Sequence, residues 1–424
     1  MKKAGRFLSV MMAAAMTMSL AACGGNTNND ASGSNNVDSG SQAENSSEDA
    51  NTDGGSESSE AANANHTDGG AAFKIGGIGP ITGGAAIYGS NVMNAASIAI
   101  DEINAAGGVN GYKLELNFQD DEHDAEKAIN AYNVVKDWGA QILVGTVTSG
   151  PCIAVSEKTM ADNMFMLTPS GSAVECVQYD NAYRVCFSDP GQGAASARYI
   201  NDNNLATKVA VIYDSSTIYS SGIYESFLAG AEDANFEIVA AEAFTADNNT
   251  DFSVQLQKAK DAGADLVFLP IYYQESSLIL TQAAGMDFNP IWFSCDGMDG
   301  ILSMEGFNTD LAEGVMLLTP FAADASDDLT VNFVTKYKEN YNDVPNQFAA
   351  DAYDAVYIIK ALIEKTGVTP DMSASDICEK FCAAILELQI DGLTGEAMTW
   401  SADGEVNKAP KAVRIENGSY VSME

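Results

Sequence analysis

Hydrophobic residues recur in two alternating patterns along most of this chain. Short apolar runs such as ILVG and MFMLT predict buried strands, and apolar residues spaced three and four apart predict amphipathic helices between them. The alternation begins at about residue 73 and restarts at the segment DPGQGAASARYINDN. Strands that alternate with helices are typical of a parallel sheet covered on both faces. The pattern therefore predicts an α/β fold with two doubly wound parallel-sheet lobes.

Small hydroxyl residues gather where two of these predicted strands end. The segment from Gln141 to Ser172 reads as two strands joined by a helix, with Thr148 and Ser149 after the first strand and Ser170 and Ser172 after the second. Loops at the carboxyl ends of parallel strands line the ligand crevice of such sheets. Hydroxyl groups beside helix N-termini suit a carboxylate or another small anion. Helix capping is the alternative role of the serines, and the two roles are compatible.

The glycine-rich segment FKIGGIGPITGG predicts a strand followed by a tight turn. It departs from the dinucleotide-binding fingerprint because its third glycine is Gly83 rather than residue 82 and Pro80 interrupts the loop. We therefore expect no cofactor. The apolar spacing that follows predicts a helix beginning at Ser90 or Asn91 and ending at Gly107-Gly108.

The second half of the chain repeats the alternation and then changes. After residue 325 helices follow one another without new strands, and the C-terminal segment reads as a strand and a hairpin. This order predicts that the chain returns to the first lobe before it ends. The predicted limits are 73–188 plus 320–400 for lobe 1, 189–319 plus 401–424 for lobe 2, and crossings near 188–190, 319–322 and 400.

The first residues have the composition of an export signal. Three basic residues precede an apolar run that is too short to span a bilayer, and the sequence LAAC, ending at Cys23, has the form of a bacterial lipobox. We expect a signal peptide at 1–22 and a lipid on Cys23 that anchors the protein outside the cytoplasm. An ordinary signal peptide is the alternative. Residues 23–72 are rich in Asn, Ser, Gly and acidic residues, which predicts a disordered acidic linker.

Charge and composition exclude several classes of function. With 21 Lys and Arg against 59 Asp and Glu, the net charge of −38 disfavours binding to nucleic acid or anionic lipid, and solubility explains it more simply. His123 is the only histidine after residue 72, and no paired CxxC motif is present, so we expect no metal. GxSxG and HExxH motifs are also absent. We therefore expect a binding protein rather than an enzyme.

Six cysteines follow Cys23. Cys176 and Cys186 flank VQYDNAYRV, which can form a hairpin, and they are the best candidates for a disulfide in an exported protein. Cys378 and Cys382 are one helical turn apart, a spacing that bridges poorly. Buried free thiols are the alternative.

Several segments taken together resemble one family. They are IGGIGPITGGAAIYG, DEINAAGGVNGYKLEL, FQDDEHDAEKAINAYNVV, LVGTVTSG and MLTPSGS. Over nearly all of residues 73–424 the chain is similar to the branched-chain amino-acid-binding proteins of ABC importers, which are type I periplasmic binding proteins with two lobes and a three-strand hinge. The resemblance implies a monomeric receptor that closes on a branched-chain or related aliphatic amino acid and delivers it to the permease subunits in the membrane.

The resemblance assigns roles to residues of the first lobe. Ser149 and Ser172 match the residues that clamp the ligand's carboxylate. Ser170 stands where the family uses a backbone carbonyl for the ligand's ammonium group. Tyr88 matches an aromatic residue that covers the ligand side chain.

Residues of the second lobe match the family as well. Tyr219 and Tyr272 match aromatic residues that close the cleft, although Tyr273 is a near-equal candidate for the second position. Asp296 matches the acid that pairs with the ammonium group, which is usually Glu in the family.

The chain also departs from the family at two places. Asp296 is one methylene shorter than Glu, so the ammonium group must lie closer or be reached through water. A disulfide seen often in the family joins positions that are His123 and Thr148 here, so that bridge cannot form. The first departure leaves the identity of the ligand open, and a receptor or sensor of the same fold for an aromatic amino acid, an amide or a urea-like compound is the alternative. An extracytoplasmic enzyme is a third hypothesis, which the missing motifs disfavour.

Overall fold

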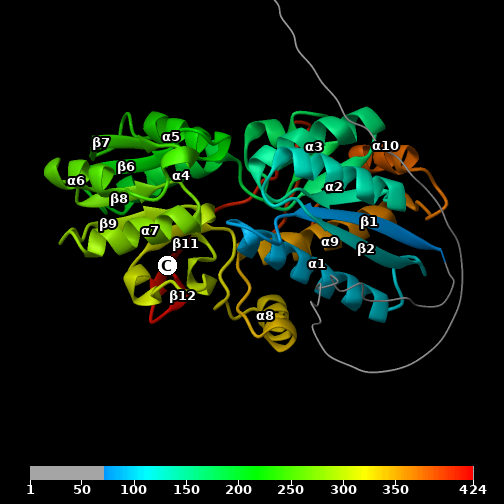
Figure 1. Ribbon diagram of the computed structural model, residues 1–424. Helices are drawn as coiled ribbons and strands as arrows, with labels where there is room; N and C mark the ends of the chain where they lie inside the picture. Colours follow the sequence, from blue (N-terminus) through cyan, green and yellow to red (C-terminus); the bar gives the residue numbers. More distant parts are fainter. Residues whose placement is uncertain (1–70, 424) are drawn as a thin grey trace, which may run out of the picture. The chain divides into compact units, whose positions relative to one another are not determined.

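The computed structural model describes residues 71–423. This part of the chain lies within a single compact unit and contains two sheets with helices packed around them (Figure 1). None of the helices within 71–423 combines the length and the apolar character that a membrane span requires. The predicted signal peptide, Cys23 and nearly all of the predicted linker lie outside the described residues.

The first sheet is entirely parallel and has the strand order β2-β1-β3-β4-β5. Adjacent residues of its strands enter different cores: Ile142 and Val144 pack into one hydrophobic cluster, and Leu143 packs into another. This alternation shows that the sheet is buried on both faces, as the continuous apolar runs predicted. The strands are β1 (Ala72–Gly79), β2 (Lys113–Asp120), β3 (Ile142–Gly145), β4 (Phe165–Thr168) and β5 (Ala182–Arg184).

The second sheet has the order β12-β11-β10-β9-β8-β6-β7. Strands β6 to β10 are parallel, whereas β11 and β12 form an antiparallel hairpin at one edge, as predicted for the C-terminal segment. The strands are β6 (Lys208–Asp214), β7 (Glu237–Phe244), β8 (Leu266–Leu269), β9 (Ile291–Ser294), β10 (Met316–Thr319), β11 (Lys411–Glu416) and β12 (Ser419–Ser422).

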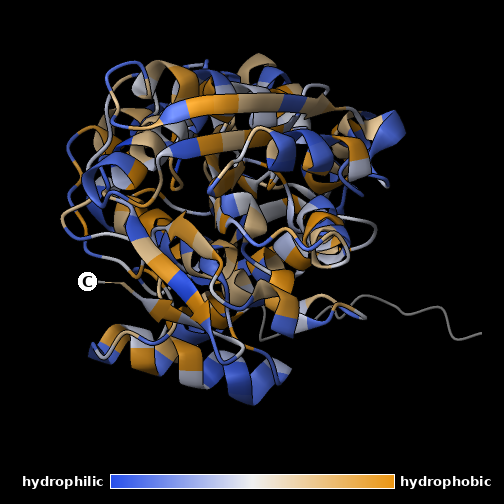
Figure 2. Cartoon of the chain, turned by 90° about the vertical axis from the view of Figure 1, so that its left-hand side faces the viewer, coloured by the Kyte–Doolittle hydropathy of each residue, from blue (hydrophilic) through white to orange (hydrophobic). Residues whose placement is uncertain are grey.

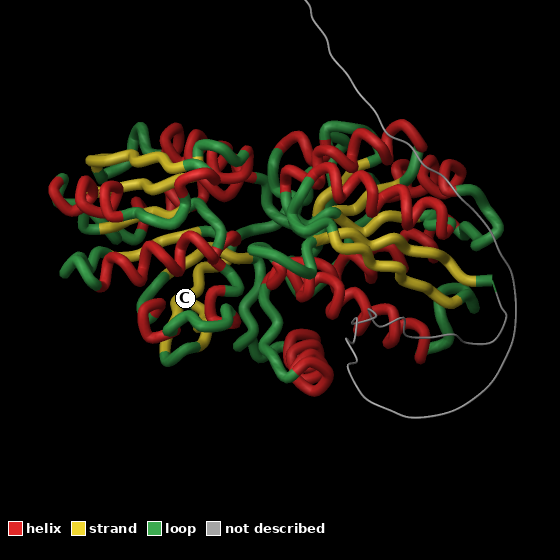
Figure 3. The backbone as a smooth tube through the Cα atoms, in the orientation of Figure 1, coloured by secondary structure: helices red, strands yellow, loops and turns green. Residues whose placement is uncertain are grey.

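Helices connect the parallel strands and cover the sheets (Figure 3). Along their length the helices alternate hydrophobic and hydrophilic residues, as expected when one side faces a sheet (Figure 2). They are α1 (Ala86–Ala105), α2 (Ala125–Trp138), α3 (Ser149–Asp162), α4 (Asp189–Asp202), α5 (Ile218–Gly230), α6 (Ser253–Asp261), α7 (Tyr273–Ala284), α8 (Asp328–Tyr341), α9 (Gln347–Thr366) and α10 (Ala374–Ile385).

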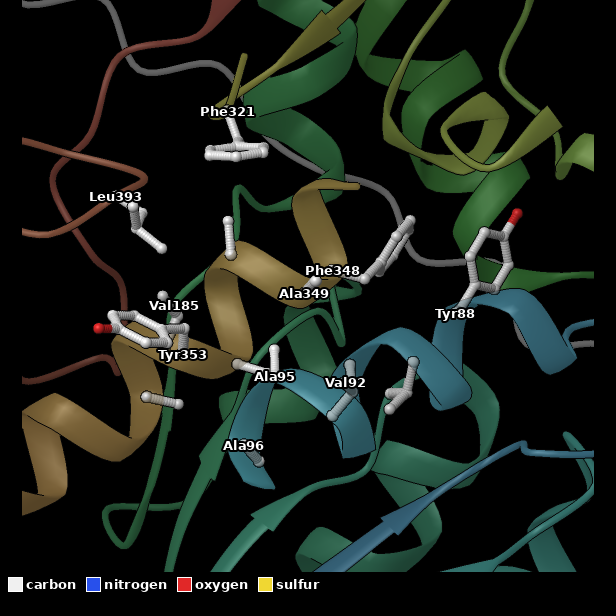
Figure 4. Close-up of a cluster of buried hydrophobic side chains, with 14 of the residues drawn as sticks. Tyr88, Val92, Ala95, Ala96, Val185, Phe321, Phe348, Ala349, Tyr353 and Leu393 are labelled. Carbon is white, nitrogen blue, oxygen red and sulfur yellow. The ribbon is translucent and has the colours of Figure 1, made fainter. Parts of the chain in front are cut away.

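Helix α9 returns the chain to the first sheet after the second sheet is almost complete. It packs along α1, and α10 packs against β4, so segments far apart in sequence share one core. Val92 of α1 and Phe348 and Tyr353 of α9 belong to this core (Figure 4). The chain thus passes between the two sheets three times, after β5, after β10 and after α10, which confirms the predicted two-lobed fold with a three-strand hinge. The residue limits proposed for the lobes stay a prediction.

Helix α1 begins at Ala86, earlier than the predicted Ser90 or Asn91. The prediction was wrong because Ala85, at the N-cap position, makes no capping hydrogen bond, so the sequence carries no start signal there. Gly89 of the first turns lies against the backbone of Pro80, where a Cβ atom would collide with its carbonyl. Glycine therefore permits the close approach of the helix to the preceding loop.

The predicted hairpin between Cys176 and Cys186 does not form. The chain instead makes a short 3₁₀ turn at Val174–Val177 and then β5, which runs parallel to β4. Cys176 packs in a cluster with Cys152, and all six cysteines of the described segment are free thiols. The predicted Cys176–Cys186 disulfide is therefore wrong, whereas the alternative of free thiols is confirmed for these residues.

Candidate functional site

Two loops of the first lobe bring the predicted serines together. Ser149 is the first residue of α3, and Ser172 follows β4; their hydroxyl oxygens lie 3.5 Å apart and both residues are buried. The N–H of Ala173 donates to Ser149 Oγ at 3.2 Å. Ser149 thus bonds the neighbouring loop and does not cap its own helix. The two hydroxyls lie beside the N-terminus of α3, where an anion is favoured.

The other two predicted hydroxyl residues have different partners. Ser170 donates its hydroxyl to the carbonyl of Val147 at 2.7 Å, so the proton of this hydroxyl is already used within the protein. Thr148 occupies the N-cap position of α3 without capping it, and its Oγ1 lies 2.8 Å from Nδ1 of His123. The pair His123 and Thr148 is therefore in contact where the family often has a disulfide. A hydrogen bond joins these positions here.

A buried arginine holds the loop that contains Ser172. Arg184, at the end of β5, is fully buried and donates to the carbonyls of Gly171 at 3.1 Å, Ser172 at 2.5 Å and Ala173 at 2.9 Å. It also pairs with Glu405 at 3.3 Å. Three consecutive carbonyls bound to one planar guanidinium group give the loop a single conformation.

The second lobe contributes a buried acid. Asp296 follows β9, and its carboxylate accepts a hydrogen bond from Tyr219 Oη at 2.6 Å. Its backbone N–H donates to Gln192 Oε1 at 3.1 Å. Burial raises the pKa of Asp296 to about 6, and the hydrogen bonds from Tyr219 and Gln192 act against this rise. An acid in this environment is ready to accept a cation.

Aromatic rings join the two lobes across this site. Tyr272 stacks on Tyr219 with ring centroids 4.7 Å apart and meets the edge of Tyr88 at 5.4 Å and of His123 at 5.6 Å. Tyr273 also contacts Tyr88, at 4.9 Å, but no ring contact joins it to Tyr219 or His123 among the described residues. The geometry therefore favours Tyr272 over Tyr273 as the aromatic residue at the centre of the site.

The hydroxyl of Tyr88 links helix α1 directly to the second lobe. It donates to the carbonyl of Gly297 at 2.5 Å and accepts from the N–H of Tyr273 at 3.2 Å. The N–H of Gly297 in turn donates to Tyr219 Oη at 2.9 Å. Residues on both sides are thus in hydrogen-bond contact, so the structure has the lobes closed on one another.

The structure adds residues that sequence reasoning missed. Asp189 is buried beside Ser172, which bonds its carboxyl group, and it interacts electrostatically with Asp296. Burial raises the pKa of Asp189 well above its ordinary value. Gln192 bonds Asp296, and Phe348 packs against Tyr88 with centroids 4.4 Å apart. The segment DPGQG was the available signal for the first two, but it was read only as the start of a second α/β unit.

The described residues of the site can bind a charged molecule. The first lobe supplies the paired hydroxyls of Ser149 and Ser172, the second lobe supplies an acid, and the tyrosine rings of both lobes contact one another beside that acid. Within residues 71–423, no group of three or more potential metal ligands comes together. This distribution of charge matches a zwitterion, because each buried charged group of such a ligand needs a partner.

Comparisons with known proteins identify the relatives of this chain. A family profile described as periplasmic binding protein matches residues 72–419. The Leu/Ile/Val-binding protein BraC3 of Rhizobium johnstonii is 31% identical over 72% of this chain and 82% of its own length. The leucine-, isoleucine-, valine-, threonine- and alanine-binding protein of Pseudomonas aeruginosa is 31% identical over 69% of this chain and 78% of its own.

A solved structure gives the same result. The branched-chain amino acid transporter substrate-binding protein LivJ of Streptococcus pneumoniae, determined in complex with isoleucine, superposes with a TM-score of 0.74. Its sequence is 27% identical to this chain, and the match covers 83% of this chain and 100% of the solved one. The chain belongs to the periplasmic binding protein family and, as its motifs predicted, to the branch of the Leu/Ile/Val-binding proteins.

Proposed function

We propose that this protein is the solute-binding component of an ABC importer and that it binds leucine, isoleucine, valine or a related aliphatic amino acid between its lobes. Family membership and the names of the relatives support this function. The observation that carries it is that Asp189, which Ser172 bonds, also interacts with Asp296, and this connects the paired hydroxyls of Ser149 and Ser172 to the buried acid of the second lobe.

Each charged end of the amino acid has a partner in this proposal. The carboxylate lies against Ser149, Ser172 and the N-terminus of α3, and the ammonium group meets Asp296 and the carbonyl of Ser170. The side chain lies among Tyr88, Tyr219 and Tyr272, which bind it through apolar contact. Recognition of the zwitterion is strict and recognition of side-chain length is loose, because an unpaired buried polar group costs more than a missing methylene.

Thermal unfolding of the protein with a ligand panel tests this proposal. Leucine, isoleucine or valine at a hundred times its Kd is expected to stabilise the folded state by about 2.7 kcal/mol and raise the Tm accordingly. Leucine methyl ester, which lacks the carboxylate charge, and isovalerate, which lacks the ammonium group, serve as matched controls and are expected to give no shift. The proposal is wrong if none of the twenty amino acids raises the Tm at millimolar concentration.

The aromatic rings favour one alternative ligand. Tyr88, Tyr219, Tyr272 and His123 form edge and stacked contacts that an aromatic side chain could join. A receptor or sensor for an aromatic amino acid would then show a larger Tm shift with phenylalanine or tyrosine than with leucine. The same panel therefore separates the two ligands.

We infer that the mature protein acts outside the cytoplasm, held to the membrane by a lipid on Cys23, and presents its ligand chemically unchanged to permease subunits. Membership of a family of transport receptors supports the location and the absence of catalysis. Replacing Cys23 with alanine is expected to release the protein from the membrane fraction. Recovery of altered amino acid after incubation would indicate an enzyme instead.

A further inference from the structure

A cavity of about 380 Å³ lies beside the amino-acid site, and Asp189 is the one residue described above that also lines this cavity. One wall comes from the turn that contains Glu175, and the other comes from the start of α4 and the exposed turns of α5. Its volume is within the range of small-molecule sites. The walls belong to both lobes, so any occupant contacts both.

The polar lining of this cavity is acidic and carries no basic side chain. Glu175 and Glu225 are exposed carboxylates. The hydroxyl of Ser226 donates to the carbonyl of Pro190 at 2.7 Å, so its proton is used and its oxygen can accept. Val174, Pro190 and Ile218 supply apolar surface. The lining therefore suits a molecule that donates hydrogen bonds and has a short hydrocarbon portion.

Asp189 gives the cavity one buried carboxylate oxygen without a donor, while Ser172 bonds the carboxyl group elsewhere. The residue lines the cavity, is 1% exposed, and its Oδ1 has no hydrogen-bond partner within the described part of the chain. Gly222 of α5 faces Asp189 and has no side chain to fill the space beside it. A Cβ atom at that position would lie 3.3 Å from Asp189 Oδ2. A buried oxygen without a partner is costly, so a donor from a bound molecule is the expected complement.

We propose that this cavity is a second binding site, which adjoins the amino-acid site at Asp189, and that it takes a small aliphatic diamine. One ammonium group bonds Asp189 in the interior, and the other lies between the carboxylates of Glu175 and Glu225. The hydrocarbon chain between them contacts Val174, Pro190 and Ile218. The proposal goes beyond the proposed function and does not require a particular amino acid in the main site.

Occupation of this cavity is expected to favour the closed arrangement. The diamine contacts both lobes, and Asp189, which it bonds, also contacts Ser172. The coupling between two sites is reciprocal, so a diamine that favours closure tightens amino-acid binding and the amino acid tightens diamine binding. The two ligands are therefore expected to bind together and not to compete.

Calorimetric titration of the full chain with 1,4-diaminobutane tests the site, with butylamine as the single-charge control and ionic strength held constant. One diamine per chain is expected, with tighter binding than butylamine. Glu175→Gln and Glu225→Gln each remove one charge-assisted contact and are expected to weaken binding about tenfold. Glu232→Gln, which removes an exposed charge outside the cavity, is expected to leave binding unchanged.

Three results would overturn the proposal. The first is no binding at millimolar diamine. The second is equal weakening by Glu232→Gln, which would indicate nonspecific attraction to an acidic protein. The third is competition between diamine and leucine, which would place the diamine in the main site. The titration is run with and without leucine, so a failure to bind leucine leaves this test intact.

Discussion

Asp296 illustrates how burial prepares a single residue for a ligand. Its carboxylate is only 4% exposed, and its hydrogen-bond partners are the neutral groups Tyr219, Gln192 and Gly297. Neutral partners reduce the cost of burying the charge but do not remove it, because no Lys or Arg within residues 71–423 pairs with Asp296. An ammonium group brought by the ligand supplies the missing charge.

Replacing Asp296 with asparagine is expected to weaken amino-acid binding by about 3–5 kcal/mol, because the ligand's buried ammonium group then lacks its counter-charge. Calorimetry on the purified variant measures the loss. Asp247→Asn, an exposed acid-to-amide change, is the matched control and is expected to keep the affinity of the unchanged protein. Equal affinities in all three proteins would remove Asp296 from the site.

The raised pKa of Asp296 also predicts how binding depends on pH. The folded pKa of about 6 lies above the ordinary 3.8, so without ligand the folded state gains stability from this group as pH falls from about 6 to about 4. The ammonium group of the ligand requires the ionised carboxylate. Affinity is therefore expected to be constant above this pKa and to fall below it.

Calorimetry in two buffers of different ionisation enthalpy measures this linkage directly. Near the pKa of Asp296, binding is expected to release protons, and the release disappears at higher pH. Asp296→Asn provides the control, since it has no carboxyl group to titrate. Proton uptake instead of release would contradict the assignment of Asp296 to the ammonium group.

The residues of the site were only partly predictable from the sequence. Ser149, Ser172, Tyr219 and Asp296 could be proposed because they lie in segments whose motifs match a family. Asp189 was not found, because its burial depends on contact with Ser172 and α5, which are distant in sequence.

At the scale of elements, continuous apolar runs predicted most strands well, whereas β5, α10 and the start of α1 were missed. Strand β5 is only three residues long, too short for an alternating pattern to be visible. Helix α10 was overlooked although Ser373 caps it by accepting from the N–H of Asp376. Helix α1 begins without any side-chain cap. Helices α1 and α10 both pack against α9, and contacts of this kind between distant segments leave no local pattern in the sequence.

Strand β5 matters most through the arginine at its end. Replacing Arg184 with methionine leaves the carbonyls of residues 171–173 without their donor and Glu405 without its counter-charge. The free energy of unfolding is expected to fall by about 3–5 kcal/mol. Amino-acid affinity is expected to fall as well, because the loop that carries Ser172 is no longer held.

Urea denaturation and leucine titration measure these two effects of Arg184→Met. Arg198→Met on α4 is the matched control, because Arg198 is exposed, and its change in stability is expected to stay within about 0.5 kcal/mol. A stable Arg184→Met protein with normal leucine affinity would show that β5 does not position the loop.

At the scale of the whole molecule, a buried charge network holds the segments that cross between the lobes. Lys408, in the third crossing segment, has a fully buried side chain and bonds Asp351 of α9 at 3.0 Å and Thr394 Oγ1 at 2.7 Å. Its ammonium group lies 5.8 Å from the ring centroid of Phe187 in the first crossing segment. One cation therefore connects two crossings to the core helix of the first lobe.

Replacing Lys408 with methionine leaves Asp351 buried without a cation. Burial already raises the pKa of Asp351 to about 6, and Lys408 acts against this rise, so removal of Lys408 raises it further. A group with a raised folded pKa destabilises the protein above that pKa and ceases to do so when it is protonated. The variant is therefore expected to lose about 3–5 kcal/mol of unfolding free energy at about pH 8 and clearly less at about pH 5.

Urea denaturation at both pH values measures this difference. Lys360→Met is the control, because Lys360 forms a solvent-accessible ion pair with Glu364 on the same helix. A loss of stability that does not depend on pH would show that Lys408 acts through packing and not through its charge.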